Sequence, residues 1–305
     1  MKKIIGNIGI ILLLTLSIRQ VSNAQDLEPR AYARVPINIT ILSPGFSYSK
    51  GNVVTDPAIL LKDLNANVET FSLGLAHTFN LFGLSAQALA VLPFSFVNAS
   101  AQGNGQLQTA NRTGTADMRF RLSVLLLGGQ AQKLQEFVKN NKPRTILGTS
   151  LTIQPPTGQY YLDKLINIGT GRWAFKPEIG LSQPLGKQWL LDLYSAVWLF
   201  TKNSSFFPGQ LLRSQNAIYT IQSHASYNIK PNLWAAFDAT YYAGGNSTIN
   251  GVAKDDQVSN FRLGGTLVLP TGKRSGLRLS LSKGAVVVKG TNFTTIAVGW
   301  NYSWF

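Results

Sequence analysis

The sequence contains no cysteine, and only 13% of its 305 residues are charged. Without cysteine there is no disulfide framework and no cysteine that could carry an N-terminal lipid. Globular domains usually have a charged fraction of about a quarter, so the surface of this protein is not that of an ordinary soluble domain. Low charge together with a high aromatic content also argues against a disordered chain.

Long apolar runs are also missing, since no stretch beyond the N-terminal region reaches the roughly 20 apolar residues of a membrane-spanning helix. The N-terminal region has Lys2 and Lys3, an apolar run over residues 4–16, and the small residues Ser22 and Ala24. This order is typical of a secretory signal peptide. We expect residues 1–24 to be a cleaved signal peptide and residues 25–305 to form one domain. An uncleaved membrane anchor is the alternative.

Acidic residues are few, with 13 Asp and Glu against 28 Lys and Arg, and the formal net charge is +15. Such a balance can indicate binding to nucleic acid or to an anionic surface. Here the basic residues are scattered and no nucleic-acid-binding motif is present, so we expect no nucleic-acid partner. We expect the basic side chains to face lipid headgroups, loops and an interior.

Aromatic residues and glycine are abundant, with 28 Gly, 16 Phe, 10 Tyr and 6 Trp. They occur in a repeating unit of about ten residues that alternates apolar and polar side chains and ends in a turn. A tilted strand that crosses a membrane has this length, about 9–11 residues. About twelve such strands are predicted, and they begin near Val35, Val68, Leu84, Ala116, Thr145, Trp173, Trp189, Asn216, Leu233, Val258, Gly276 and Phe293.

The predicted connections alternate between short and long, which is the pattern of an outer-membrane barrel with short periplasmic turns and longer extracellular loops. One connection on the short side is unusually long, and Leu134, Phe137 and Val138 within it have helical spacing. It predicts a short periplasmic helix at residues 130–141. The short turns are expected at residues 79–83, 182–188, 229–233 and 270–276, and the long loops at 50–64, 98–114, 155–170, 202–213, 244–257 and 286–292.

Each strand has one apolar and one polar face. In residues 116–127, for example, Phe120 and Leu122 alternate with Arg119 and Arg121. A soluble β-sandwich shows the same alternation with its polar face outside. The low charge, the signal peptide and an apolar last strand favour the opposite arrangement. The predicted fold is therefore all-β, a transmembrane antiparallel up-and-down β-barrel of about 12 strands.

In a barrel the polar faces line the lumen, because a charge that faces hydrocarbon costs a few kcal/mol. These side chains can either pair with one another to brace the wall or contact a solute, and the sequence leaves both alternatives open. The predicted strands at residues 175–181 and 191–200 are neighbours, so their polar side chains are expected to form one cluster. The lumen candidates are Asp117, Arg119, Arg121, Lys176, Glu178, Asp192, Tyr194, His224, Asp238, Arg262 and Arg278.

The last strand ends on aromatic residues. Trp300, Tyr302 and Trp304 share one face, and the chain ends at Phe305. This end resembles the C-terminal signal by which the barrel assembly machinery recognises outer-membrane proteins, so we expect that machinery and outer-membrane lipid as partners. In the usual signal the apolar residues share the face of the final Phe, whereas here they share that of Trp304.

Catalytic motifs are missing too. The two histidines are His77, on an apolar face, and His224, on an inner face. A serine mechanism needs a histidine beside the nucleophile, and neither a G-x-S-x-G nor an H-E-x-x-H motif is present. We therefore expect no enzyme activity, no cofactor and no metal.

Several segments are similar to a bacterial outer-membrane transporter family labelled putative phenol meta-pathway degradation. They are "GTGRWAFKPEIGLSQPLGKQWLLDLYSAVWLFTKN", "IQSHASYNIKPNLWAAFDATYYAGGNSTING", "FRLGGTLVLP" and "LRLSLSKGAVVVKGTNFTTIAVGWNYSW". The resemblance covers most of residues 30–305, and "QKLQEFVKNN" departs from it as a local insertion. It implies an outer-membrane barrel grouped with transporters for hydrophobic or aromatic compounds, and it brings no catalytic residues.

The predicted function is an outer-membrane channel for passive diffusion of small solutes, hydrophobic or aromatic ones included. About twelve strands should leave a lumen narrower than that of a sixteen-stranded porin. A structural or adhesive barrel, with a plugged lumen and loops presented outward, is the alternative. A barrel enzyme and a soluble secreted sandwich are further readings, which phospholipid turnover and solubility without detergent would identify.

Overall fold

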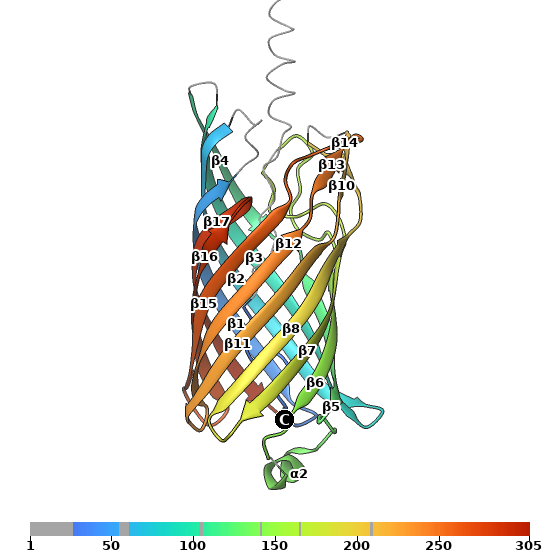
Figure 1. The fold of residues 1–305 in the computed structure, drawn as a ribbon, viewed down its shortest axis with the longest axis vertical. Helices are drawn as coiled ribbons and strands as arrows, with labels where there is room; N and C mark the ends of the chain where they lie inside the picture. Colours follow the sequence, from blue (N-terminus) through green and yellow to red (C-terminus); the bar gives the residue numbers. More distant parts are fainter. Residues whose placement is uncertain (1–26, 55–60, 104–105, 141, 165, 208–209) are drawn as a thin grey trace, which may run out of the picture.

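The computed structural model describes residues 27–54, 61–103, 106–140, 142–164, 166–207 and 210–305, and they form a closed antiparallel β-barrel (Figure 1). Thirteen strands of this described part share one sheet, and its ring is complete because β2 pairs with both β1 and β3. Strands β4 and β5 follow one another along β3 and occupy one position in the wall. The barrel is thus twelve strands around with one extra strand, which confirms the predicted fold.

The twelve positions of the wall are formed by β1 (Thr40–Val54), β2 (Leu61–Leu81), β3 (Leu84–Gly103), β4 (Gln106–Thr115) with β5 (Arg119–Leu127), β6 (Ile146–Gln154), β7 (Ala174–Leu185), β8 (Trp189–Phe200), β11 (Ile218–Lys230), β12 (Leu233–Gly244), β15 (Val258–Pro270), β16 (Ser275–Val287) and β17 (Gly290–Trp304). The expected signal peptide, residues 1–24, lies outside the described residues.

Short turns join the strands at one end of the barrel, and longer connections join them at the other (Figure 1). The turn between β2 and β3 needs left-handed backbone at Phe82 and Gly83, and the turn between β11 and β12 needs it at Asn232. Glycine and asparagine adopt this conformation more readily than other residues. The short-turn end also carries α2 (Leu134–Lys139), which lies within the range of the expected helix.

Strands extend into five of the six expected long loops, all except 155–170 in the described residues, so the predicted loop bounds were wrong in detail. In the range 98–114, β3 continues to Gly103 and β4 begins at Gln106, and the two strands pair as a hairpin. The alternation of side chains continues through this range, and the pairing satisfies the hydrogen-bonding groups of the backbone. The connections at 202–213 and 244–257 contribute a second sheet of four strands, β9 (Asn203–Phe206), β10 (Leu211–Gln215), β13 (Ser247–Ile249) and β14 (Val252–Ala253).

The first strand begins at Thr40 and not near Val35. The chain turns at Asn38, whose φ is +63°, and the backbone then pairs through Asn38 and Ile39 with Thr78. Residues 27–36 come before this turn and do not belong to the wall, because their polar groups bond to side chains inside the barrel instead. The alternating residues near Val35, which predicted a strand, therefore belong to the segment that precedes β1 inside the barrel.

The outer face of the barrel is apolar and the inner face is polar. Along β7, β8 and β11 the side chains alternate between buried and exposed. The exposed positions hold side chains such as Ile179, Leu193 and Ile221, and the buried ones hold polar side chains such as Glu178 and Asp192. An apolar exterior is the reverse of a soluble sandwich and is typical of a membrane barrel.

Strand β17 closes the barrel by pairing with β1, from Thr40 opposite Trp304 to Val54 opposite Gly290. Its outer face carries Trp300 and Tyr302, whose rings stack 5.8 Å apart, and Tyr302 stacks in turn on Trp304 at 6.1 Å. Phe305 follows β17 and is exposed.

Within the described ranges, no helix combines the length and the apolar character needed to cross a membrane.

The orientation of the two faces can be tested on neighbouring strands. We expect Leu193→Arg, in the middle of β8, to lower the free energy of unfolding in lipid vesicles by about 2–4 kcal/mol, because it places a charge at mid-membrane depth. The matched change Leu185→Arg, at the end of β7, should cost about 0–1 kcal/mol. Urea titration of the refolded protein measures both, and equal costs would contradict this placement of the strands.

Candidate functional site

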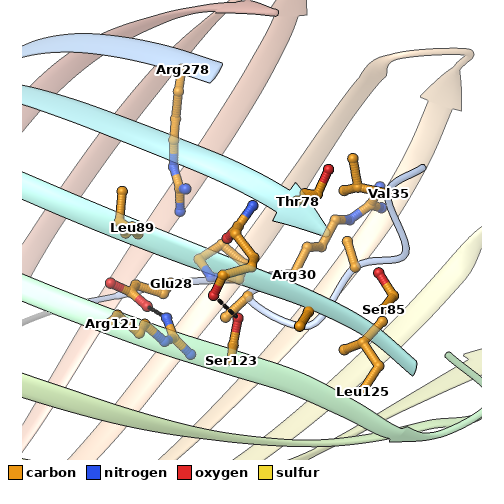
Figure 2. Close-up of a pocket in the computed structure, with 15 residues that line it drawn as sticks. Glu28, Arg30, Val35, Thr78, Ser85, Leu89, Arg121, Ser123, Leu125 and Arg278 are labelled. Atoms are coloured by element: carbon orange, nitrogen blue, oxygen red, sulfur yellow. Dashed lines mark hydrogen bonds and ion pairs between the residues drawn. The ribbon is translucent and has the colours of Figure 1, made fainter. Parts of the chain in front are cut away.

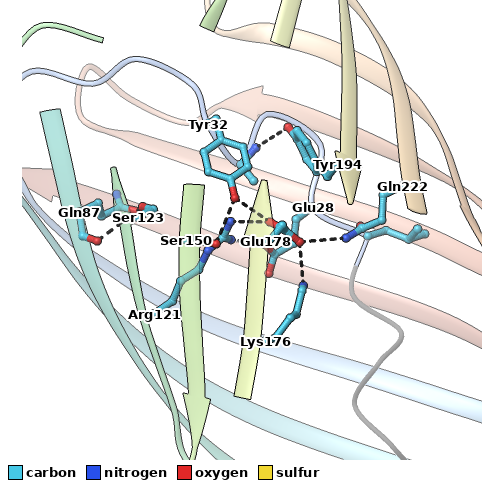
Figure 3. A network of polar contacts seen from close by, with 12 residues as sticks. Glu28, Tyr32, Gln87, Arg121, Ser123, Ser150, Lys176, Glu178, Tyr194 and Gln222 are labelled. Atoms are coloured by element: carbon cyan, nitrogen blue, oxygen red, sulfur yellow. Dashed lines mark hydrogen bonds and ion pairs between the residues drawn. The ribbon is translucent and has the colours of Figure 1, made fainter. Parts of the chain in front are cut away.

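The lumen of the barrel is partly filled by residues 27–39, which we call the lumenal segment (Figure 3). Tyr32, in its middle, is 1% exposed. From residue 27 inside the barrel the segment runs toward the short-turn end and leaves it beside Thr78, where β1 begins. The hydroxyl of Thr78 donates to the carbonyl of Pro36 at 2.7 Å and accepts from the backbone N–H of Ile39 at 2.9 Å.

Tyr32 anchors the segment to the wall. Its hydroxyl donates to Oε1 of Glu178 on β7 at 3.0 Å and lies 3.0 Å from Oγ of Ser150 on β6. Its ring meets the ring of Tyr194 on β8 edge to face, with centroids 5.2 Å apart. Burial, and next the negative charge of Glu178, raise the pKa of Tyr32, so its hydroxyl stays protonated and keeps donating.

The ring of Tyr32 lies over two glycines that face each other across β6 and β7. Gly148 and Gly180 are register partners, and a Cβ at either position would stand 2.2 or 2.3 Å from ring carbons of Tyr32. Real Cβ atoms do not approach that closely, so only glycine fits under the ring. We call this pair the glycine socket. A third glycine, Gly264 on β15, lies under Leu27 in the same way, with 2.4 Å to Cδ1.

Glu178 is the centre of the polar network around Tyr32 (Figure 3). Its side chain is 2% exposed and receives Nη2 of Arg121 at 2.9 Å and Nζ of Lys176 at 3.0 Å. Arg121 also binds the carboxylate of Glu28 in the lumenal segment. Two cations and two carboxylates therefore compensate one another. This compensation matters because an unpaired buried charge costs several kcal/mol.

Arg30 and Ala31, between Glu28 and Tyr32, bind β8, β11 and β12. The backbone N–H of Arg30 donates to Oδ2 of Asp192 at 3.1 Å, and its Nη2 donates to Oδ1 of Asn228 at 2.7 Å. The guanidinium carbon lies 4.2 Å from the ring centroid of Trp234, a cation–π distance. The backbone N–H of Ala31 donates to the hydroxyl of Tyr194 at 3.1 Å. The contacts of Arg30 and Ala31 therefore lie on the same side of the barrel as those of Tyr32, while Thr78 on β2 holds Pro36 and Ile39.

His224 forms a separate buried pair with Asp238. Nδ1 of His224 and Oδ1 of Asp238 are 2.7 Å apart, and Thr266 donates to Oδ2 of Asp238 at 2.8 Å. Both side chains of the pair are 0% exposed, so neither reaches lipid or bulk water.

All eleven predicted lumen candidates are on inward-facing positions of the barrel, although not all in the same role. Asp117 braces a loop, since it accepts from the backbone N–H groups of Gly158 and Thr170 at 2.8 Å each. Arg262 is held by Ser282 and Thr295. The expected single cluster of Lys176, Glu178, Asp192 and Tyr194 consists of two groups, one around Glu178 and one around Asp192, and the lumenal segment joins them.

The sequence reasoning missed the lumenal segment and the glycine socket. Two signals were available: charged and aromatic residues in "LEPRAYARVP" just before the first strand, and two inward glycines on consecutive strands.

Cavities of about 270 and 390 Å³ lie beside the lumenal segment, bordered by described residues. The first is bordered by β3 and β5 and is shown in Figure 2. The second is bordered by β1, β16 and β17. Both border on Glu28 and Arg278. The lumen is therefore narrowed but not filled.

In the described part of the chain, no three His, Cys, Asp or Glu side chains are arranged to hold a metal ion.

Residues 43–304 match the protein family described as "Putative MetA-pathway of phenol degradation". The chain belongs to this family. No match was found among curated proteins.

Solved structures share the fold. An outer membrane channel from Pseudomonas putida F1 aligns with a TM-score of 0.78 at 20% identity, over 92% of this chain and 100% of that one. The β domain of the Bordetella autotransporter BrkA aligns with a TM-score of 0.54 at 13% identity, over 88% and 100%. The translocator domain of the autotransporter NalP from Neisseria meningitidis gives 0.51 at 10% identity, over 88% and 90%. At these identities the likeness concerns the fold.

The glycine socket can be tested by chemical labelling, because the chain has no cysteine of its own. In an Ala31→Cys background, we expect Gly180→Ala to speed labelling by a water-soluble maleimide about tenfold, since overpacking costs about 1–3 kcal/mol. Gly265→Ala is the matched control, because its Cβ would stand 3.6 Å from the nearest atom, a normal contact. Equal labelling rates in both variants would contradict the role of the socket.

The contact between Glu28 and Arg121 predicts a pH dependence. Burial raises the pKa of Glu28, but the charges of Arg121, Lys176, Arg278 and Arg119 outweigh it and lower this pKa from 4.5 to about 2. A lowered pKa stabilises docking of the segment above pH 4.5, and that stability is lost as the pH falls toward 2. The rate is expressed relative to that of an exposed Lys187→Cys variant at the same pH, because the thiolate that reacts becomes scarcer as the pH falls. This relative labelling rate of Ala31→Cys should be constant from pH 7 to 5 and higher below 4.5. This increase should be absent in Glu28→Gln, and an unchanged increase there would assign it to another group.

Proposed function

We propose that this protein is an outer-membrane channel through which small solutes diffuse passively. The observation that carries the proposal is a polar lumen with free volume inside an apolar exterior: cavities of about 270 and 390 Å³ lie beside the lumenal segment. In this orientation the short turns and α2 face the periplasm and the long loops face outward. Export would use the signal peptide at residues 1–24.

We further propose that the solutes include hydrophobic or aromatic compounds. The family description names phenol degradation, and one of the solved structures with a similar fold is an outer membrane channel. A channel near such a pathway would supply substrate and would carry out no chemistry itself. The burial of His224 and Asp238 agrees with this, because a catalytic histidine must reach its substrate.

Assembly would depend on the last strand. An aromatic group lies at the short-turn end of β17, where assembly machinery could bind it during insertion. It consists of the exposed Trp300, Tyr302 and Phe305 and the half-buried Trp304. Afterwards the aromatic rings on the outer face would lie at the level of the lipid headgroups.

A structural or adhesive barrel with a plugged lumen remains the second candidate, because the lumenal segment occupies part of the lumen. The two functions differ in one measurable property. A channel passes ions or solutes through its remaining volume, whereas a plugged barrel passes none.

Conductance of the refolded protein in planar bilayers distinguishes them. We expect small discrete current steps for the complete chain. After deletion of residues 27–35 the steps should be at least about twofold larger, because the deletion removes most of the lumenal segment that narrows the lumen. Folding of each protein is verified by its resistance to urea in vesicles. If both folded proteins were silent, the lumen would be closed and the structural role would be favoured.

A further inference from the structure

The lumenal segment divides the lumen unequally. Its residues Glu28, Arg30 and Tyr32 bind β5, β6, β7, β8, β11 and β12. It also has bonds to β2, where Thr78 holds Pro36 and Ile39, and to β16, where Arg278 donates to the carbonyl of Leu27. The larger cavity lies opposite, along β1, β2, β16 and β17. We call these four strands the open side.

The open side has room because its inward side chains are small. They include Ser43, Gly45 and Ser47 on β1, and they alternate with outward apolar residues as on the other strands. On the opposite side the inward positions hold long side chains such as Arg121 and Lys176. The free volume is therefore a property of the wall sequence. The remaining small residues that border the larger cavity are Ser72, Ser280, Ser282, Thr295, Ala297 and Gly299.

Arg278 stands where the two cavities meet. It belongs to the lining of both, and Figure 2 shows its guanidinium group reaching into the smaller one from β16. Its Nη2 donates to the carbonyl of Leu27 at 3.3 Å. Among the described residues, Arg278 has no carboxylate within the 4.0 Å of an ion pair, whereas Glu28 beside it is paired with Arg121. Most of the donor capacity of Arg278 is thus left for a solute or water.

The charges around this junction are predominantly positive. The smaller cavity is lined by Arg30, Arg121 and Arg278 against the single carboxylate of Glu28. A narrow passage with low-dielectric walls focuses such a field and raises the local concentration of ions of the opposite sign. A guanidinium also fits a carboxylate well, since it can donate two parallel hydrogen bonds.

We propose that solutes pass along the open side, and that Arg278 is a specificity-determining residue that favours small carboxylates over cations and neutral compounds of the same shape. The inference rests on the proposed channel function and adds a solute class to it. An aromatic carboxylate such as benzoate combines the apolar body and the charge that this passage fits.

The first test is the reversal potential of the complete refolded protein in a potassium chloride gradient. We expect the wild type to prefer chloride over potassium, and Arg278→Gln to lower this preference by about threefold or more, because one charge is removed from the lining of both cavities. Arg278→Lys keeps the charge and should keep most of the preference. Lys187→Gln removes one charge from an exposed turn outside the lumen and should leave the preference unchanged.

The second test uses matched solutes and does not depend on conductance. Calorimetric titration should show that benzoate binds the wild type and that benzamide, its uncharged analogue, binds at least about tenfold more weakly. Arg278→Gln should remove this difference while the barrel stays folded in urea titrations.

The outcomes separate the two proposals. A conducting wild type that prefers potassium or shows no preference would overturn the assignment of Arg278 and leave the channel function intact. A silent wild type that still binds benzoate through Arg278 would support the carboxylate site and contradict free diffusion. A wild type that binds benzoate and benzamide equally, or binds neither, would overturn the inference.

Discussion

The contact of Tyr32 with Glu178 is the interaction on which the interior of the barrel depends. Glu178 is almost completely excluded from water, and the wall places two cations, Arg121 and Lys176, against this one carboxylate. The excess positive charge is balanced by Glu28, which the lumenal segment brings to Arg121. Docking of the segment therefore completes the charge balance of the wall. The segment and the strands opposite it form one electrostatic unit.

Space inside the barrel follows from this attachment. Twelve strands enclose more volume than their own side chains fill, so additional chain can enter. The glycine socket admits the ring of Tyr32 on the β6–β7 side, and long side chains fill the positions around it. Small side chains on β1, β16 and β17 leave the larger cavity on the other side of the lumen unfilled. The sizes of inward residues, strand by strand, thus decide where the lumen is occupied and where it is free.

The sequence predicted the wall well and the contents of the lumen poorly, for a physical reason. The alternation that identifies a strand and its inner face is local, so Arg121, Lys176 and Glu178 could be placed inward from their neighbours alone. The position of the lumenal segment depends on partners far away in the chain: Tyr32 bonds to Glu178, 146 residues later, and Arg30 to Asn228, 198 residues later. Its own alternation resembled that of a strand near Val35, and the charged and aromatic residues of the segment do not by themselves identify these distant partners.

Two kinds of interaction oppose release of the lumenal segment from the wall, namely its ion pairs and the packing of the Tyr32 ring. If Tyr32 left the glycine socket, Glu178 and Arg121 would face a wider, water-containing lumen, where water could replace the lost hydrogen bond. Ion pairs lose little when they become hydrated, because solvation offsets the weaker attraction between the charges. The tight packing of the Tyr32 ring has no such replacement, since water cannot restore contacts with Gly148 and Gly180. Packing at the socket, more than the ion pairs, therefore holds the segment against the wall.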